Sequence, residues 1–93
     1  MRESQIEKYF VAQVKKLGGV AEKFTSPGRK NVPDRIVFFS GGRVYFVELK
    51  ATGKKPTAAQ TRDHKRRVRM GFCVLVVNSK DGALTVARSI SRI

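Results

Sequence analysis

Two acidic residues stand inside the most hydrophobic stretch of the chain, VPDRIVFFSGGRVYFVELK at residues 32–50. Asp34 precedes one apolar run and Glu48 lies near the end of another, although the whole chain has only seven acidic residues. Lys50 follows Glu48 by two positions, so in a strand both side chains leave the same face. One interpretation is a strand end with a solvated ion pair. The other is a site in which carboxylates and an amine act together.

The position of Asp34 favours a site. Residues 36–39 and 44–50 flank the turn Ser40-Gly41-Gly42, which predicts a hairpin. Asp34 follows a proline, a residue typical of a strand's beginning, and would lie near Glu48 at the open end of that hairpin. Two carboxylates this close repel one another unless a cation neutralises them. Oxygen ligands of this kind suit Mg²⁺ or Mn²⁺, with water and substrate phosphate completing the coordination.

The first helix adds further acids. The helix expected over residues 3–17 repeats apolar side chains at three- and four-residue intervals: Ile6, Phe10, Val14 and Leu17. Glu3 and Glu7 fall within the same arc, on the side that turns towards the sheet. They are either partners of the helix dipole or a third acid of the site. Glu7 lies deeper in the helix, so we favour it over Glu3.

The other predicted elements complete a mixed α/β sheet covered by helices. We expect a short strand at residues 20–24, a second helix at 57–70, and a short helix near the C-terminus. The apolar run at residues 72–78 predicts a central strand buried on both faces, with Cys73 as a buried reduced thiol. The order is αβββαβ plus a short C-terminal element, in a single domain over residues 1–93.

The charge of the chain indicates a polyanionic partner. Twenty Lys and Arg against seven Asp and Glu give a net charge of +13, and nucleic acid would relieve the resulting self-repulsion. We find neither a signal peptide, nor a bilayer-spanning run, nor a basic amphipathic helix that would bind a membrane, so we expect a cytoplasmic protein. A basic DNA- or RNA-binding module without catalytic activity is an alternative that charge does not exclude.

The motifs resemble those of a known family. Pro33-Asp34 and Glu48-Leu49-Lys50, after a helix with a glutamate and before a basic helix with Gln60, resemble the PD-(D/E)XK nuclease superfamily. Within it, GRKNVPDR, VYFVELK and Gln60 are similar to the VRR-NUC (virus-type replication-repair nuclease) domain, above all its small stand-alone members in phages and bacteria. The resemblance implies a restriction-endonuclease-like fold and a metal-dependent DNA endonuclease in a bacterial or phage-infected cell.

The resemblance also implies roles for the acids and the lysine. Asp34 and Glu48 would be metal ligands, with the Leu49 carbonyl adding an oxygen. Lys50 would position or deprotonate the attacking water and counter the charge on the phosphate. A serine or cysteine nucleophile with a histidine base has no support, because the chain has only one histidine and one cysteine.

Four residues on the two helices have more than one interpretation. Glu7 would correspond to the first-helix acid that holds the metal or its water, with Glu3 as a substitute. Gln60 matches the family glutamine on the second helix, but Thr57 and Gln60 also fit a capping box, and both roles can apply. His64 lies one turn after Gln60, and we interpret it as a surface or packing residue outside catalysis.

Basic side chains surround the expected site and predict contacts with the DNA backbone rather than with bases. These residues are Arg29, Lys30, Arg35, Lys54, Lys55, Arg62, Lys65, Arg66, Arg67 and Arg69. The stand-alone members are similar to Holliday-junction resolvases, which implies a homodimer acting on branched or four-way-junction DNA. The family pattern calls for no organic cofactor.

Overall fold

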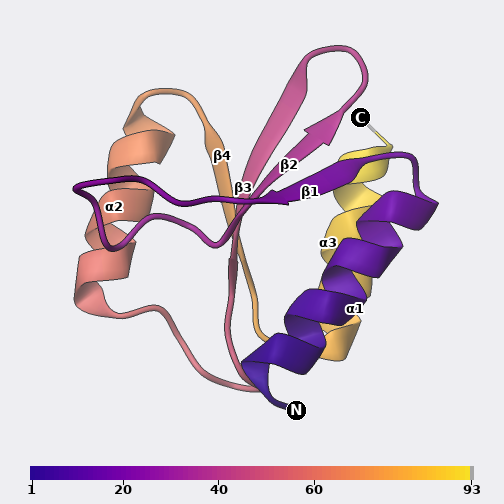
Figure 1. The fold of residues 1–93 in the computed structure, drawn as a ribbon, viewed down its shortest axis with the longest axis horizontal. Coiled ribbons are helices and arrows are strands. Elements are labelled where there is room, and N and C mark those ends of the chain that lie inside the picture. Colours follow the sequence, from indigo (N-terminus) through magenta and orange to yellow (C-terminus); the bar gives the residue numbers. More distant parts are fainter. Residues whose placement is uncertain (93) are drawn as a thin grey trace.

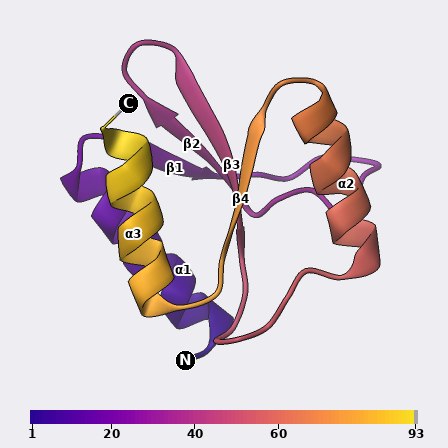
Figure 2. The ribbon, with the colours of Figure 1, turned by 180° about the vertical axis from the view of Figure 1, so that it is seen from behind.

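One sheet runs through the protein and separates its helices into two layers. The computed structural model describes residues 1–92, in which four strands pair in the order β1-β2-β3-β4. The elements along the chain are α1 (Glu3–Lys16), β1 (Val20–Lys23), β2 (Arg35–Phe39), β3 (Arg43–Leu49), α2 (Ala58–Arg69), β4 (Cys73–Val77) and α3 (Lys80–Ser91). Figures 1 and 2 show α1 and α3 together on one side of the sheet and α2 on the other.

The sheet is mixed, as the sequence predicts. Strand β2 pairs antiparallel with both β1 and β3, whereas β3 and β4 are parallel and joined through α2. The turn between β2 and β3 contains Gly41 and Gly42, both with a positive φ (83° and 74°). Glycine adopts this conformation without steric cost, which explains why the chain reverses here. The predicted hairpin is therefore confirmed.

The main core lies between the sheet and the pair α1 and α3. Alternate residues of the strands point into this core, and α1 packs against it with the apolar residues of one helix face. Its buried members are Ile6, Phe10, Val14, Val37, Phe39, Tyr45, Val47, Leu49, Val77, Ala83, Ala87 and Ile90. The small side chains of α3 let that helix lie close to its neighbours. Because Tyr45, Val47 and Leu49 face this layer, the residues between them on β3 must face α2.

The C-terminal segment forms a longer helix than the sequence analysis expects. Helix α3 has 12 residues and is capped by the preceding residue, Ser79, whose hydroxyl accepts a hydrogen bond from the Gly82 amide at 2.9 Å. The expected helix rests on the spacing of Val86, Ile90 and Ile93, of which Ile93 lies outside the described residues. Among residues 1–92, none of the helices has both the length and the hydrophobicity needed to cross a bilayer.

The prediction of a central strand at residues 72–78 is wrong. β3 is an inner strand, whereas β4 lies at the edge of the sheet with only β3 beside it. Only Val77 of β4 is fully buried; Val76 is 39% exposed, and Cys73 is exposed rather than buried. A continuous apolar run is compatible with either place, because strand order depends on pairings distant in sequence.

Candidate active site

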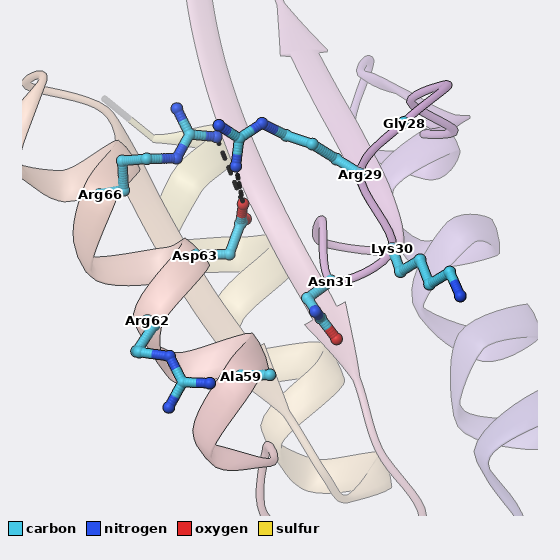
Figure 3. Close-up of a pocket in the computed structure, with 8 residues that line it drawn as sticks. All are labelled: Gly28, Arg29, Lys30, Asn31, Ala59, Arg62, Asp63 and Arg66. Carbon is cyan, nitrogen blue, oxygen red and sulfur yellow. Dashed lines mark hydrogen bonds and ion pairs between the residues drawn. The ribbon is translucent and has the colours of Figure 1, made fainter.

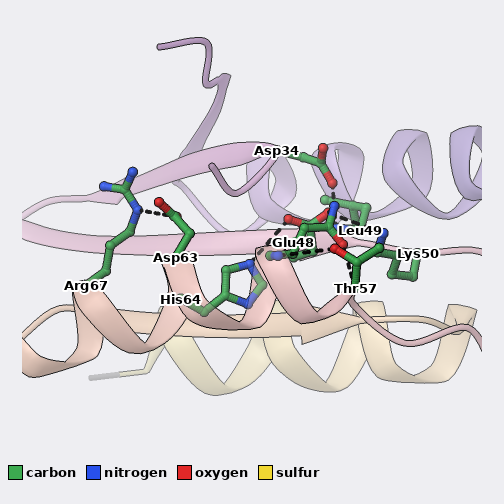
Figure 4. A network of polar contacts seen from close by, with 9 residues as sticks. Asp34, Glu48, Leu49, Lys50, Thr57, Asp63, His64 and Arg67 are labelled. Carbon is green, nitrogen blue, oxygen red and sulfur yellow. Dashed lines mark hydrogen bonds and ion pairs between the residues drawn. The ribbon is translucent and has the colours of Figure 1, made fainter. Parts of the chain in front are cut away.

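Asp34 and Glu48 lie opposite each other at one end of the β2–β3 pair. Arg35 pairs with Val47, so the preceding residue, Asp34, lies across from Glu48 and on the same face of the sheet. The Asp34 Oδ2 atom accepts a hydrogen bond from the Leu49 amide at 2.8 Å. This bond fixes the Asp34 carboxylate beside the end of β3 (Figure 4).

Glu48 is enclosed between the sheet and α2. Its side chain is only 2% exposed, and Figure 4 shows it between Asp34 and α2. Gln60 Nε2 donates to Glu48 Oε2 at 3.3 Å, and His64 Nε2 lies 3.4 Å from Oε1. Lys50 Nζ lies 3.9 Å from Glu48 Oε2. An amide, an imidazole and an amine therefore surround one buried carboxyl group.

This environment disfavours the charged form of Glu48. Burial raises the pKa of Glu48 to about 8, with further upward contributions from the charge and hydrogen bonding of Asp34, while the charge on Lys50 acts downward. The charge on Glu3 also raises the Glu48 pKa. At neutral pH the Glu48 carboxyl is therefore mostly protonated, and a cation placed between it and Asp34 would favour its ionised form.

His64 shares the enclosure. The sequence analysis interprets it as a surface or packing residue, but it is buried and lies directly against Glu48. Burial lowers the pKa of the His64 ring, so a neutral imidazole faces the carboxyl group at pH 7. His64 follows Gln60 by four residues, and this spacing places the two side chains on the same face of α2. It is the feature of the sequence that could have predicted a position of His64 near the site.

Gln60 fulfils two roles at once. The side-chain Oε1 of Gln60 accepts a hydrogen bond from the backbone N–H of Thr57 at 2.9 Å. The backbone N–H of Gln60 donates to Thr57 Oγ1 at 3.1 Å, and the two bonds form the capping box at the start of α2. The other end of the same side-chain amide reaches Glu48. Because the cap fixes the side chain of Gln60, it also directs Nε2 at the buried carboxyl group.

The structure does not bring Glu7 to this cluster, unlike the expectation. Glu7 Oε2 contacts Arg35 Nε at 2.8 Å and Lys23 Nζ at 3.1 Å. Both partners lie in register with Val47 on the α1 side of the sheet, whereas Glu48 faces α2. Burial alone would raise the pKa of Glu7, but the hydrogen bonds and charges of Arg35 and Lys23 together lower it. Helical periodicity directed Glu7 towards the sheet without identifying the face.

Several cations expected to bind DNA are held by contacts within the protein. Arg35 pairs with Glu7. Arg29, Arg66 and Arg67 surround Asp63, whose side chain is 6% exposed. Arg67 also lies over the rings of Phe24 and Phe46, at 5.0 and 5.2 Å. The more accessible members of the predicted set are Lys30, Lys54, Lys55, Arg62, Lys65 and Arg69, together with Arg29, which is exposed despite its ion pair with Asp63.

The donor set fits a hard cation that keeps part of its water shell. Among residues 1–92, no group of three or more His, Cys, Asp and Glu side chains could hold a metal ion. Asp34, Glu48 and a main-chain carbonyl are, however, the partial set of oxygen ligands that Mg²⁺ uses when substrate phosphate supplies the rest. The raised pKa of a buried carboxyl group beside a second carboxylate is the electrostatic signature of such a site.

Comparisons with known proteins agree with the fold and with the family resemblance. No family model matches the chain. A solved structure described as a "VRR_NUC domain" superimposes with a TM-score of 0.86 at 32% identity, covering 92% of this chain and 94% of that one. The "Putative nuclease p44" of Acyrthosiphon pisum secondary endosymbiont phage 1 is 51% identical over 81 residues, 87% of each protein. The chain therefore belongs to the VRR-NUC family of the PD-(D/E)XK nuclease superfamily.

Proposed function

We propose that the protein is a divalent-metal-dependent DNA endonuclease that hydrolyses phosphodiester bonds beside Asp34 and Glu48. One observation carries this proposal: a 2%-exposed carboxyl group, Glu48, lies opposite Asp34 and 3.9 Å from the Lys50 amine. Burying a carboxyl group next to another acid is costly for folding. A binding module that only contacts DNA has no use for that arrangement, whereas a site for a cation requires it.

The ion would be Mg²⁺ or Mn²⁺, held by Asp34, Glu48 and the Leu49 carbonyl. Glu3 is the first-helix acid that remains, because Glu7 is engaged by Arg35 and Lys23. When bound, the ion supplies positive charge that lowers the pKa of the attacking water and offsets the charge of the phosphoryl group.

The protein's own groups would orient the remaining reactants. In hydrolysis a water oxygen forms a bond to phosphorus, the bond from phosphorus to one ester oxygen breaks, and that oxygen takes up a proton. Lys50, 15% exposed beside Glu48, would orient the water and stabilise the negative charge that develops on the phosphate. Gln60 and His64 hold the Glu48 side chain in place from α2.

We propose branched DNA, such as a four-way junction, as the substrate and a homodimer as the active form. Each copy offers one such site, and resolving a junction requires cuts in two strands. A two-fold dimer supplies two equivalent sites in a fixed relation. The net charge of +13 favours a substrate with a high density of phosphates.

A cleavage assay tests the proposal. Purified protein is incubated with four-way, flap and linear DNA in Mg²⁺, Mn²⁺ or EDTA. We expect cleavage only with a divalent ion, and we expect Glu48→Gln and Lys50→Ala to bind DNA without cutting it. Glu22→Gln is the matched control, because it removes an exposed acid from β1 and should cut normally. Normal cleavage by Glu48→Gln would refute the site, and DNA binding without cleavage by the wild type would favour a non-catalytic module.

A further inference from the structure

A second pocket lies beside the candidate active site, between α2 and the segment that leads to Asp34. Residues 28–31 line it from the loop, and Ala59, Arg62, Asp63 and Arg66 line it from α2. Its volume is about 490 Å³ (Figure 3). We call it the arginine pocket. None of the roles assigned above to Asp34, Glu48 or Lys50 accounts for it.

The arginine pocket contains more positive than negative charge. Asp63 is its buried acid, and three guanidinium groups share that carboxylate. Arg66 Nη2 lies 3.3 Å and Arg29 Nη1 3.9 Å from Oδ1, while Arg67 Nε lies 3.0 Å from Oδ2. One carboxylate cannot neutralise three cations, so two positive charges remain uncompensated in this group. Asp63 therefore positions the arginines and is not free to bind a cation.

The arginines have hydrogen-bond donors that the protein does not use. A guanidinium carries five N–H groups, and Asp63 engages one nitrogen of Arg66 and one of Arg29. Arg66 Nε is buried and has no hydrogen-bond partner among the described residues, but the Arg66 side chain as a whole is 38% exposed, so its outer N–H groups can reach a ligand. Arg29 is 55% exposed, and Figure 3 shows its guanidinium meeting that of Arg66 above Asp63. Planar guanidinium groups held in this way match the oxygens of a phosphate.

The arginine pocket adjoins the candidate active site at the same two turns of α2. Ala59 and Asp63 line the pocket, and the next residues, Gln60 and His64, contact Glu48. Neighbouring stripes of one helix thus border the two sites. The two sites are therefore neighbours around the helix at the same two turns, and a polyanion that passes across these turns can reach both.

We propose that the arginine pocket binds a backbone phosphate of the DNA substrate at a position close to the phosphate that is cleaved. Arg62 and Arg66 from α2 and Arg29 from the loop would contact its oxygens, and Asp63 would orient two of them. This inference rests on the proposed function, because it assumes DNA as the polyanion. Its role would be to fix the position of the DNA strand relative to Asp34, Glu48 and Lys50.

A competing interpretation is that the cluster only ties the loop to α2. Arg62 separates the two interpretations. It lines the pocket and is exposed, so Arg62→Gln removes a phosphate contact and leaves the Asp63 cluster intact. Arg66→Gln changes both the contact and the cluster. Arg88→Gln is the matched control, because it removes one exposed charge from α3, on the opposite side of the sheet (Figure 1).

The test measures duplex DNA binding in EDTA as a function of salt concentration, so that neither cleavage nor a metal ion contributes. Each phosphate contact adds about 0.9 to the slope of log affinity against log salt, which is about 3.5-fold in affinity between 50 and 200 mM salt. We expect the slope to become shallower by about 0.9 in Arg62→Gln and in Arg66→Gln, and to be unchanged in Arg88→Gln. Equal slopes in all three variants would overturn the proposal.

Substituted DNA locates the phosphate. A methylphosphonate replaces one charged phosphate by a neutral group at successive positions. We expect one position at which this change weakens binding by Arg62→Gln less than binding by the wild type, because only the Arg29 and Arg66 contacts remain to be lost in that variant. Purely additive losses at every position would overturn the proposal. Because binding alone is measured, a protein that passes this test but never cleaves DNA would refute the nuclease proposal and leave the phosphate site standing.

A titration with inorganic phosphate tests whether the arginine pocket binds free phosphate rather than a phosphate of the DNA backbone. If the arginine pocket takes free phosphate instead of DNA, millimolar phosphate will raise the melting temperature of the wild type but not that of Arg66→Gln. Together with unchanged salt slopes for DNA, that result would also overturn the proposal. A shallower slope in Arg62→Gln supports the DNA phosphate whether or not free phosphate binds.

Discussion

The substitution Glu48→Gln isolates the cost of the buried acid. Glutamine keeps the size of the side chain and its oxygen acceptor for Gln60, but it cannot ionise. The pKa of Glu48 in the folded protein is about 8, against 4.5 for an ordinary glutamate. The folded protein therefore binds more protons than the unfolded chain between these two values, and the free energy of unfolding must fall as pH rises through this range.

The size of the effect follows from the same two values. The difference between about 8 and 4.5 is about 3.5 pH units, and one unit corresponds to about 1.36 kcal/mol, giving on the order of 5 kcal/mol. In EDTA, the free energy of unfolding of the wild type minus that of Glu48→Gln should decrease by an amount of this order between pH 4 and pH 9. Most of the loss should occur below pH 8. Urea denaturation at a series of pH values measures it.

A divalent ion should reverse this cost. With a pKa of about 8, roughly nine-tenths of Glu48 is protonated at pH 7, so binding of Mg²⁺ should release close to one proton. Calorimetric titration in two buffers with different ionisation enthalpies counts that proton. Glu22→Gln reports the effect of removing one acid from the surface. A stability difference that does not change with pH, or metal binding without proton release, would refute the electrostatic reasoning.

Three further substitutions test separate parts of the structure. Lys50→Ala should lower single-turnover cleavage by roughly 10²- to 10⁴-fold while the DNA dissociation constant changes little; a loss below tenfold would contradict a catalytic role. Glu7→Gln should destabilise the protein by about 1–2 kcal/mol in thermal unfolding, because Arg35 loses its charged partner; lost Mn²⁺ binding with an intact fold would instead place Glu7 at the metal. Gly19→Ala should cost about 1–3 kcal/mol in urea denaturation, because a Cβ there lies 2.7 Å from the Phe39 ring; unchanged stability would show that the ring can move.

Local rules were sufficient to predict the geometry around Glu48. Strand alternation and the Gly41-Gly42 turn depend only on neighbouring residues, and together they predicted that Asp34 and Glu48 lie close together. The capping box between Thr57 and Gln60 likewise follows from short-range spacing on α2, whereas the contact between Gln60 and Glu48 depends on how α2 packs. The fold class was predictable for the same reason, since each element carries its own periodicity.

Features set by long-range order were not predictable in this way. An apolar run identifies a strand but does not show whether that strand lies at the edge of the sheet, so the predicted central position of β4 was wrong. Periodicity directs Glu7 towards a sheet but does not say which face of that sheet the helix covers. The burial of His64 against Glu48 and the clustering of arginines around Asp63 depend on how α2 packs. These contacts join segments that are distant along the chain.

Binding of Mn²⁺ tests the central claim most directly, namely that Asp34 and Glu48 together hold a divalent cation. Electron paramagnetic resonance of free Mn²⁺ gives the dissociation constant for the wild type and for Asp34→Asn, Glu48→Gln and Glu22→Gln. We expect the first two substitutions each to weaken binding by roughly 10- to 100-fold, and Glu22→Gln to leave it unchanged. Equal Mn²⁺ affinity in all four proteins would contradict the account.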